Sequence, residues 1–288
     1  MARQRGAEPA IVKGAETIDL QEGGSHGVLL LHGFGDTPQT LSLLAHRLAK
    51  NGYGVFAPLL PGHGRTMDAF RSSRAEEWIA TARDSLRGMH DRYGTVSVVG
   101  LSMGAALAVI IGAESESVAS LSLVAPYLGM PTHVHSAAIL HWLWGPFAGE
   151  INSRNPRSIR DPIEREKNLA YGTVTGRTLF ELSKVVRRAR RALSGLKAPT
   201  LIIMSNDDPR VSLRVGEFAL KKLGARDKKL VVTEGAGHII TVDYGRERVF
   251  AEIQGWLNAH DGHGATAAEN YRAAVERPSA RSDPGRIP

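Results

Sequence analysis

The stretch Gly100-Leu101-Ser102-Met103-Gly104 decides the fold of this 288-residue chain. It follows the β-branched run at residues 95–99 and precedes the apolar run at residues 105–111. The sequence therefore predicts a strand, a sharp turn and a helix, with Ser102 at the turn. A side chain at either flanking glycine would clash where the chain folds back. We therefore expect the serine hydroxyl to be exposed on a strained corner, where it is available for chemistry.

The composition is that of an ordinary soluble globular protein, with 42% hydrophobic and 23% charged residues. The formal net charge is +7, and the basic residues are spread along the chain apart from Arg187, Arg188, Arg190 and Arg191. These arginines lie in a segment, residues 179–193, whose apolar residues recur at helical spacing. We interpret them as the solvated face of a helix rather than an anion site, and we expect no nucleic-acid partner.

Membrane and export signals are weak in this sequence. The basic start Met1-Ala2-Arg3-Gln4-Arg5 is not followed by the apolar segment of a signal peptide. The longest uncharged apolar stretch, residues 103–113, is too short to span a bilayer. The absence of cysteine excludes disulfides and thiolate metal sites. We expect a cytoplasmic protein without stable membrane insertion.

Strand and helix patterns alternate along most of the chain, which predicts an α/β fold with a mostly parallel, doubly wound sheet. Ile11-Val12 and residues 17–20 look like an antiparallel edge hairpin, and residues 28–31 like a strand buried on both faces. Further strands are expected at residues 55–60, 95–99, 120–124, 199–204 and 230–232, and helices at residues 37–50, 75–93, 213–223 and 246–257.

The alternation breaks at Pro126 and resumes after Leu196. The residues between show several short helical patterns and no strand pattern. An insertion between a strand and a helix lies at the carboxyl ends of the strands, where ligands bind in such sheets. We therefore expect a core of residues 1–126 and 197–260, a cap insertion at residues 127–196, and a disordered tail at residues 261–288.

Two further stretches carry the partners that a nucleophilic serine needs. A serine hydroxyl is a poor nucleophile at neutral pH and needs a general base, which a carboxylate orients. Asp207 and Asp208 follow the strand at residues 199–204, and His238 follows the strand at residues 230–232 and two glycines. Because these positions come just past strand ends, we expect them at the same sheet edge as Ser102.

This pattern does not decide which of the two aspartates is the acid. Pro209 pushes Asp208 into an extended loop, from which its carboxylate could reach an imidazole. Asp207 is also explained as a turn or helix-cap carboxylate. Asp243, five residues past the histidine, is interpreted as the cap of the last helix.

A developing oxyanion needs two backbone N–H groups. Met103, directly after the serine, and Phe34, in the glycine-rich loop after the first buried strand, are the expected donors. His32 and His63 are expected to bond backbone and shape loops rather than to carry protons.

Four motifs together resemble those of α/β-hydrolases: Leu30-Leu31-His32-Gly33-Phe34, Pro58-Leu59-Leu60-Pro61-Gly62-His63-Gly64, Gly100-Leu101-Ser102-Met103-Gly104 and Gly237-His238. Among these, the chain more closely resembles the small bacterial carboxylesterases and monoacylglycerol lipases, over roughly residues 25–258. The resemblance implies an α/β-hydrolase fold with a small helical cap. It also implies a catalytic triad of Ser102, Asp208 and His238, since residues 208–211 fit the Asp-x-x-Val turn of the family and Asp207 does not.

The resemblance further implies a serine hydrolase that cleaves carboxylic esters through an acyl-enzyme, without a metal or organic cofactor. We expect a small ester with an apolar acyl chain as its substrate. Leu140, Trp142 and Trp144 belong to an apolar cluster in the cap that could line an acyl pocket or pack on the core. The alternatives are a thioesterase, acyltransferase or perhydrolase with the same triad, and a receptor that uses its pocket only for binding.

Overall fold

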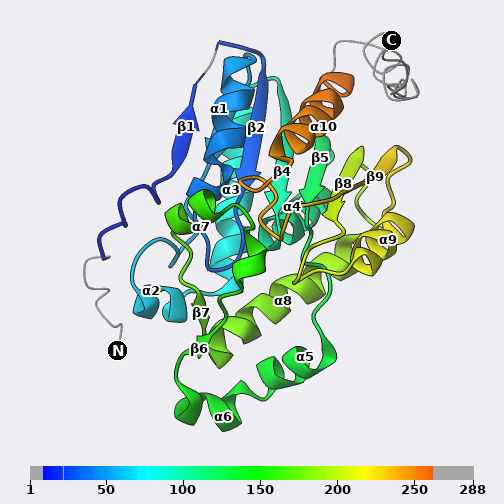
Figure 1. Ribbon diagram of the computed structural model, residues 1–288. Helices are drawn as coiled ribbons and strands as arrows, with labels where there is room; N and C mark the ends of the chain where they lie inside the picture. Colours follow the sequence, from blue (N-terminus) through cyan, green and yellow to red (C-terminus); the bar gives the residue numbers. More distant parts are fainter. Residues whose placement is uncertain (1–8, 22, 262–288) are drawn as a thin grey trace, which may run out of the picture.

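The computed structural model describes residues 9–21 and 23–261 (Figure 1). Apart from its first residue, the tail predicted at residues 261–288 lies outside this part of the chain. Seven of the strands in the described residues form one sheet in the order β1-β3-β2-β4-β5-β8-β9. These strands are β1 (Ile18–Leu20), β2 (His26–Leu31), β3 (Gly54–Ala57), β4 (Thr95–Leu101), β5 (Val118–Val124), β8 (Thr200–Ser205) and β9 (Lys228–Thr233).

The sheet is parallel except at one edge, where β1 runs antiparallel to β3. This arrangement confirms the predicted α/β class. The predicted edge hairpin is wrong, because Ile11 and Val12 form no strand; the Val12 N–H instead donates to the carbonyl of Gly64. A run of two apolar residues carries too little alternation to identify a strand.

Helices cover both faces of the sheet. In β2, Leu29 and Leu31 contribute to one buried apolar cluster, whereas Val28 and Leu30 contribute to another. Side chains alternate between faces along a strand, so the two clusters mark the two sides of the sheet. The helices on the side of Leu29 are α3 (Ala75–Arg92), α4 (Met103–Glu114), α8 (Gly176–Ala192) and α9 (Leu213–Lys222), and those on the side of Val28 are α1 (Ser42–Lys50) and α10 (Arg246–Ala259). The short helix α2 (Met67–Ser72) contributes Phe70 to the first cluster.

Some predicted boundaries shift by a few residues. The predicted strand at residues 55–60 ends at Ala57, and the helix expected from Thr37 begins as a 3-10 helix, Pro38–Leu41, before α1. The other predicted strands and helices of the core are present, with ends displaced by at most two residues.

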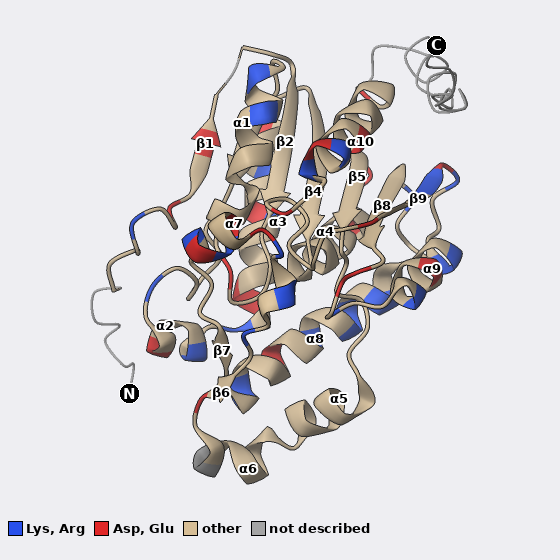
Figure 2. Cartoon of the chain, in the orientation of Figure 1, with Lys and Arg blue, Asp and Glu red and all other residues tan. Residues whose placement is uncertain are grey.

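Helix α4 is buried all round, which explains its apolar sequence. Every residue from Met103 to Gly112 is buried, because the sheet lies on one side and α8 packs on the other. On α8 itself, Arg187 and Arg191 are exposed, and Arg188 pairs with Glu76 and Glu114. Figure 2 shows several blue stretches, which mark Lys and Arg, along the ribbon of α8. The exposure of Arg187 and Arg191 agrees with the predicted solvated face.

Residues 127–196 contain more structure than predicted. Their elements are α5 (Thr132–Ile139), α6 (His141–Ala148), β6 (Ile151–Asn152), a 3-10 helix (Pro156–Ser158), α7 (Pro162–Lys167), β7 (Thr173–Val174) and α8. Strands β6 and β7 pair antiparallel, so the prediction of no strand here is wrong. Two-residue strands are too short to leave a period in the sequence. Across residues 9–21 and 23–261, none of the helices has the length and apolar character needed to cross a bilayer.

Candidate active site

Ser102 occupies a strained corner between β4 and α4. Its φ of 56° and ψ of −114° lie outside the region that residues other than glycine usually adopt. A Cβ on Gly104 would collide with the carbonyl oxygen of Leu31, and a Cβ on Gly100 would collide with the backbone of Gly104. Both glycines are therefore required by close backbone approach, as the sequence predicts.

Hydrogen bonds from the neighbouring strand stabilise this corner. The Ser102 N–H donates to the carbonyl of Val124 at 2.9 Å, and the Ser102 carbonyl accepts the N–H of Tyr127 at 3.1 Å. Both partners lie at the end of β5 or just past it. The carboxyl ends of β4 and β5 thus hold the backbone of the serine in place.

Ser102, His238 and Asp208 form a chain of hydrogen bonds. The imidazole Nε2 of His238 lies 2.8 Å from the Ser102 hydroxyl oxygen, and its Nδ1 lies 2.8 Å from Oδ2 of Asp208. A carboxylate only accepts hydrogen bonds, so Nδ1 carries the proton and Nε2 is free to accept the serine proton. The side chains of Asp208 and His238 are almost fully buried, which keeps water away from both bonds.

The other oxygen of Asp208 is held by its own loop. Oδ1 accepts the backbone N–H groups of Arg210 at 2.7 Å and Val211 at 3.0 Å. Asp207 does not contact His238: its Oδ2 accepts the N–H of Gly235, and its Oδ1 pairs with Arg160. The structure therefore brings Asp208, and not Asp207, to the imidazole.

The loop after β2 approaches the serine closely. A Cβ on Gly33 would lie 3.5 Å from the Cβ of Ser102, and Phe34 follows in the same loop. Met103 is the first residue of α4, so its N–H is among the four that a helix leaves without an intrahelical acceptor. Both predicted oxyanion donors thus belong to backbone segments next to Ser102.

Two buried histidines shape the loops beside the site. His32 Nε2 accepts the N–H of Leu60 at 3.1 Å, so Nδ1, 2.9 Å from the Gly33 carbonyl, is the donor. Burial lowers the pKa of His32 to about 4. Burial and the neighbouring His32 hold the pKa of His63 well below its usual range. Both side chains bond to backbone, as expected, and both stay neutral near pH 7.

Asp36 is a buried carboxylate beside the site that the sequence reasoning did not single out. Its oxygens accept the Thr37 N–H at 2.9 Å and the Thr40 hydroxyl at 3.0 Å. Burial raises the pKa of this carboxyl to about 7, although both hydrogen bonds oppose the rise. The sequence signal that could have found Asp36 is its place in the glycine-rich loop after β2, three residues past Gly33.

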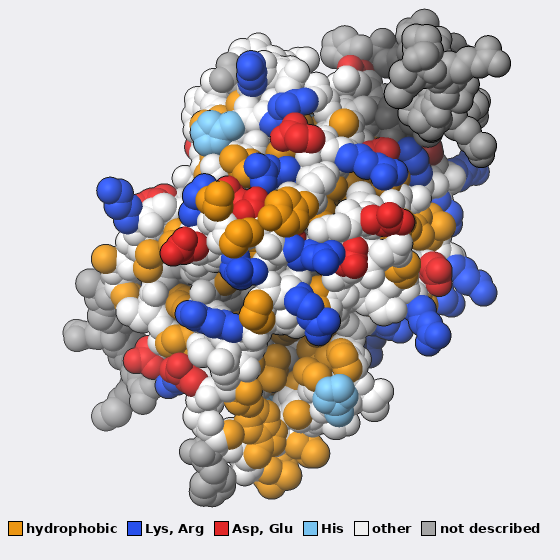
Figure 3. Space-filling model, viewed as in Figure 1, with side chains coloured by type: hydrophobic (Ala, Val, Ile, Leu, Met, Phe, Trp, Pro, Cys, Tyr) orange, Lys and Arg blue, Asp and Glu red, His pale blue; other side chains and the backbone are white. Residues whose placement is uncertain are grey.

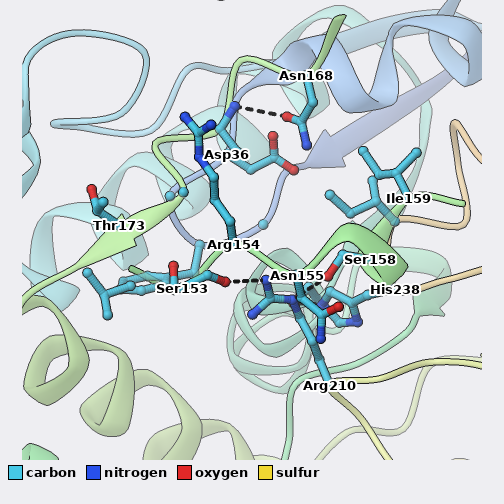
Figure 4. A pocket seen from close by; sticks show the side chains of 18 of the residues that line it. Asp36, Ser153, Arg154, Asn155, Ser158, Ile159, Asn168, Thr173, Arg210 and His238 are labelled. Carbon is cyan, nitrogen blue, oxygen red and sulfur yellow. Dashed lines mark hydrogen bonds between the residues drawn. The ribbon is translucent and has the colours of Figure 1, made fainter. Parts of the chain in front are cut away.

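A cavity of about 760 Å³ opens beside Ser102 and His238. Figure 4 shows Arg210 of the acid loop and Ser158 next to His238, with Asp36 and Asn168 elsewhere on the wall. Its apolar lining residues include Phe34, Leu101, Val134, Ile159, Val174, Leu179, Leu182 and Ile239. Its polar lining residues include Asp36, Ser153, Arg154, Asn155, Ser158, Arg165, Glu166, Asn168, Thr173 and Arg210. Within the described residues, no three His, Asp or Glu side chains cluster so that they could hold a metal ion.

The predicted acyl-pocket residues lie elsewhere. Leu140, Trp142 and Trp144 are not part of this cavity lining. Leu140 and Trp142 are 44% and 64% exposed, and Trp144 donates its indole N–H to the carbonyl of Ala137. Figure 3 shows the resulting apolar surface at the lower end of the view, where α5 and α6 lie. The apolar wall instead includes Leu179 and Leu182, which belong to the segment with helical spacing at residues 179–193.

Asp243 is not the helix cap that the sequence suggested. Helix α10 begins after Gly245, which occupies the N-cap position, and no side chain caps it. The Asp243 carboxylate is fully buried and instead accepts backbone N–H groups, including that of Gly237 next to His238. This role depends on residues far apart in the chain, so a local motif could not reveal it.

The fold and this site define a serine hydrolase of the α/β-hydrolase class. Residues 25–244 match the family model described as "Serine aminopeptidase, S33", and the chain belongs to this family.

Curated relatives and a solved structure agree with this class. The chain is 26% identical to a thermostable monoacylglycerol lipase of Bacillus sp. strain H-257 over 88% of its length and 98% of the relative. It is 22% identical to a carboxylesterase of Bacillus subtilis strain 168, over 83% of this chain and 95% of the relative. A solved structure from work on LipS and LipT, two metagenome-derived lipolytic enzymes, superposes with a TM-score of 0.80 at 28% identity. It covers 87% of this chain and 100% of that one. The predicted fold and the predicted class, a carboxylic ester hydrolase, are confirmed.

Proposed function

We propose that this protein hydrolyses small carboxylic esters with an apolar acyl chain and a polar alcohol, of the monoacylglycerol type. The observation that carries the proposal is the hydrogen-bonded chain from Asp208 through His238 to Ser102, with bonds of 2.8 Å, at the wall of a large cavity. In this chain Ser102 supplies the nucleophile, His238 its base and Asp208 the carboxylate that orients the base.

In the proposed reaction, the Ser102 oxygen attacks the acyl carbon while His238 Nε2 takes the hydroxyl proton. The backbone N–H groups of Phe34 and Met103 stabilise the oxyanion of the tetrahedral intermediate. His238 then gives its proton to the leaving alcohol, and the acyl group stays on Ser102. A water molecule, deprotonated by His238, attacks this acyl-enzyme, which releases the carboxylic acid and restores the serine hydroxyl.

The cavity lining supports the substrate class. Apolar side chains such as Ile159, Leu179 and Leu182 suit an alkyl chain, whereas Asn155 and Asn168 offer amide groups to hydroxyls of an alcohol such as glycerol. A pocket with both apolar and polar surface fits an amphipathic ester better than it fits a fully apolar ester.

We further propose that residues 127–196 act as a cap on a core of residues 1–126 and 197–260. Support comes from the cavity, because this segment supplies most of its lining, from Tyr127 to Leu182. The cap then selects the substrate, while the core carries out the chemistry.

Release of fatty acid from 1-monoacylglycerols tests this function. The parent protein should turn over medium-chain monoacylglycerols, and a serine-directed phosphonate should stop the reaction. Parallel assays with an acyl thioester, an aminoacyl p-nitroanilide and an alcohol as acyl acceptor separate the alternatives. Faster turnover of the anilide would favour the peptidase activity in the family's description, and tight binding without turnover of any substrate would favour a receptor.

A further inference from the structure

A second buried carboxylate, outside the triad, organises the loop that carries His238. Asp243 is 0% exposed and accepts four backbone N–H groups. Its Oδ1 accepts those of Asp161 at 2.9 Å and Tyr244 at 2.8 Å. Its Oδ2 accepts those of Arg160 at 2.8 Å and Gly237 at 2.6 Å. All four lone-pair directions of the carboxylate are thus used.

These bonds join the histidine loop to residues 158–161 of the cap. Gly237, directly before His238, is tied to that segment through Asp243. Ile239, directly after His238, donates its N–H to the carbonyl of Ser158 at 2.9 Å. The backbone also packs tightly, because a Cβ on Gly237 would collide with the carbonyl oxygen of Arg157. Both neighbours of the catalytic imidazole are therefore fixed to the same stretch of the cap.

The same stretch also contacts the loop of the acid and the cavity. Arg210, two residues past Asp208, donates its Nε–H to the Ser158 hydroxyl at 2.7 Å. Ser158 and Ile159 line the cavity beside His238 (Figure 4). One short segment thus contacts the base loop, the acid loop and the substrate cavity.

We propose that Asp243 is a positioning residue, which holds His238 at Ser102 by fixing Gly237 to residues 160–161 of the cap. The inference rests on the proposed function, since it assigns to Asp243 the placement of the proposed general base. Asp243 does not reach the reacting atoms and acts only through the loop. Its carboxylate makes the position of the imidazole depend on the position of the cavity wall.

The isosteric substitution Asp243→Asn tests this role. An amide offers one oxygen and one NH₂ group, so two of the four backbone N–H groups would face a donor instead of an acceptor. If the NH₂ group replaces Oδ2, it opposes the N–H of Gly237, and the histidine loop is released. If it replaces Oδ1, the amides of Asp161 and Tyr244 lose their acceptor, and Arg160 alone still joins the cap to Gly237 through the remaining oxygen.

We expect Asp243→Asn to lower kcat for a short p-nitrophenyl ester by about 30-fold or more, with KM changed by less than about 3-fold. The far-downfield proton resonance of the His238–Asp208 bond should broaden or shift in the same variant. Glu181→Gln is the matched control, because the Glu181 carboxylate is also buried, accepts the backbone N–H of Ala75 at 3.0 Å and belongs neither to the cavity lining nor to the histidine loop. It should lower the melting temperature and keep kcat near that of the parent.

Two results would overturn the proposal. One is a kcat for Asp243→Asn within about 3-fold of the parent, and the other is an equal loss of kcat in both variants at equal losses of melting temperature. Ser102→Ala keeps the proposed function separate: if that variant is inactive while Asp243→Asn is fully active, only the role of Asp243 fails. If Ser102→Ala is active, the proposed function itself fails.

Hydrogen exchange in the parent protein gives a second test that needs no variant to fold. The amides of Arg160, Asp161 and Gly237 share one acceptor, so they should exchange at a common slow rate. Modification of Ser102 by a phosphonate should change the rates of all three together. Exchange at residues 160 and 161 that is much faster than at Gly237, and insensitive to the phosphonate, would contradict the coupling.

Discussion

The imidazole Nε2 of His238 lies 2.8 Å from the hydroxyl oxygen of Ser102, although the two residues are 136 positions apart in the chain. The parallel order of β4, β5, β8 and β9 brings the loops of Ser102, Asp208 and His238 together at the carboxyl ends of these strands. The chemistry of the site therefore depends on sheet topology as much as on the serine corner.

Asp208→Asn should lower kcat by about 10³- to 10⁴-fold, because the imidazolium formed in the reaction loses its negative partner and the imidazole loses its orientation. Asp207→Asn is the matched control, since Asp207 bonds Gly235 and Arg160 and not the histidine. Steady-state kinetics on one ester measures both variants. A larger loss in Asp207→Asn would contradict the assignment of the acid.

Gly104→Ala should lower the free energy of unfolding by about 3 kcal/mol or more, because the new methyl group would collide with the carbonyl oxygen of Leu31. Gly88→Ala is the control, since Gly88 lies within α3 with open space where a Cβ would stand. That variant should gain about 0.5–1 kcal/mol from the lower backbone entropy of its unfolded state. Denaturant titrations measure both changes, and a stable Gly104→Ala protein with parental activity would show that the corner is looser than described.

Asp36→Asn should change the pH dependence of stability. The pKa of Asp36 is about 7 in the folded protein against an ordinary value of 3.8, so its contribution to stability is complete below about pH 4. That contribution is lost as the pH rises through 7, when the buried carboxyl must ionise. Asparagine does not ionise, so the stability of the variant relative to the parent should be greater at pH 8 than at pH 4, by up to about 4 kcal/mol.

The buried His32 has the opposite effect on the parent. Its pKa of about 4 lies below the ordinary 6.5, so its contribution is lost as the pH falls from about 6.5 to 4. This loss occurs in both proteins and cancels in their difference. Melting curves of both proteins from pH 4 to 9 give the result, and a constant difference across that range would contradict an ionising, buried Asp36.

Leu179→Ala should alter chain-length preference, because Leu179 lines the cavity. Loss of its contact should lower kcat/KM for medium-chain esters by about 10- to 100-fold and leave acetyl esters almost unchanged. Trp142→Ala is the comparison, since Trp142 is 64% exposed and outside the cavity lining. With soluble monomeric esters it should behave like the parent. The reverse pattern would restore the sequence prediction that the tryptophans form the acyl pocket.

The sequence predicts the parts of this protein that local rules govern. Ser102 is identified by two glycines that close backbone contacts require, and His238 by its place after a buried strand. Asp208 is separated from Asp207 by the geometry before Pro209 and by the family's turn motif. Each of these signals lies within a few residues of the side chain concerned.

Contacts between distant segments are where the sequence reasoning fails. Asp243 resembles a helix cap locally, but its carboxylate bonds Arg160, which is 83 positions away. The cavity wall at residues 153–159 has neither helical nor strand periodicity, so no pattern points to it. The apolar residues of α5 and α6 look like a pocket in the sequence, yet Trp142 and Leu143 are exposed, because these short helices lie at the periphery of the molecule, away from the sheet (Figure 1).

Labelling with a fluorophosphonate tests the central claim most directly. The reagent should attach to one residue per chain, on the peptide that contains Ser102, and labelling should abolish ester turnover. Ser102→Ala should take up no label and lose activity with an unchanged melting temperature, while His238→Ala should label very slowly, because its serine lacks a base. A label on another residue, or ester turnover by Ser102→Ala close to that of the parent, would contradict the account.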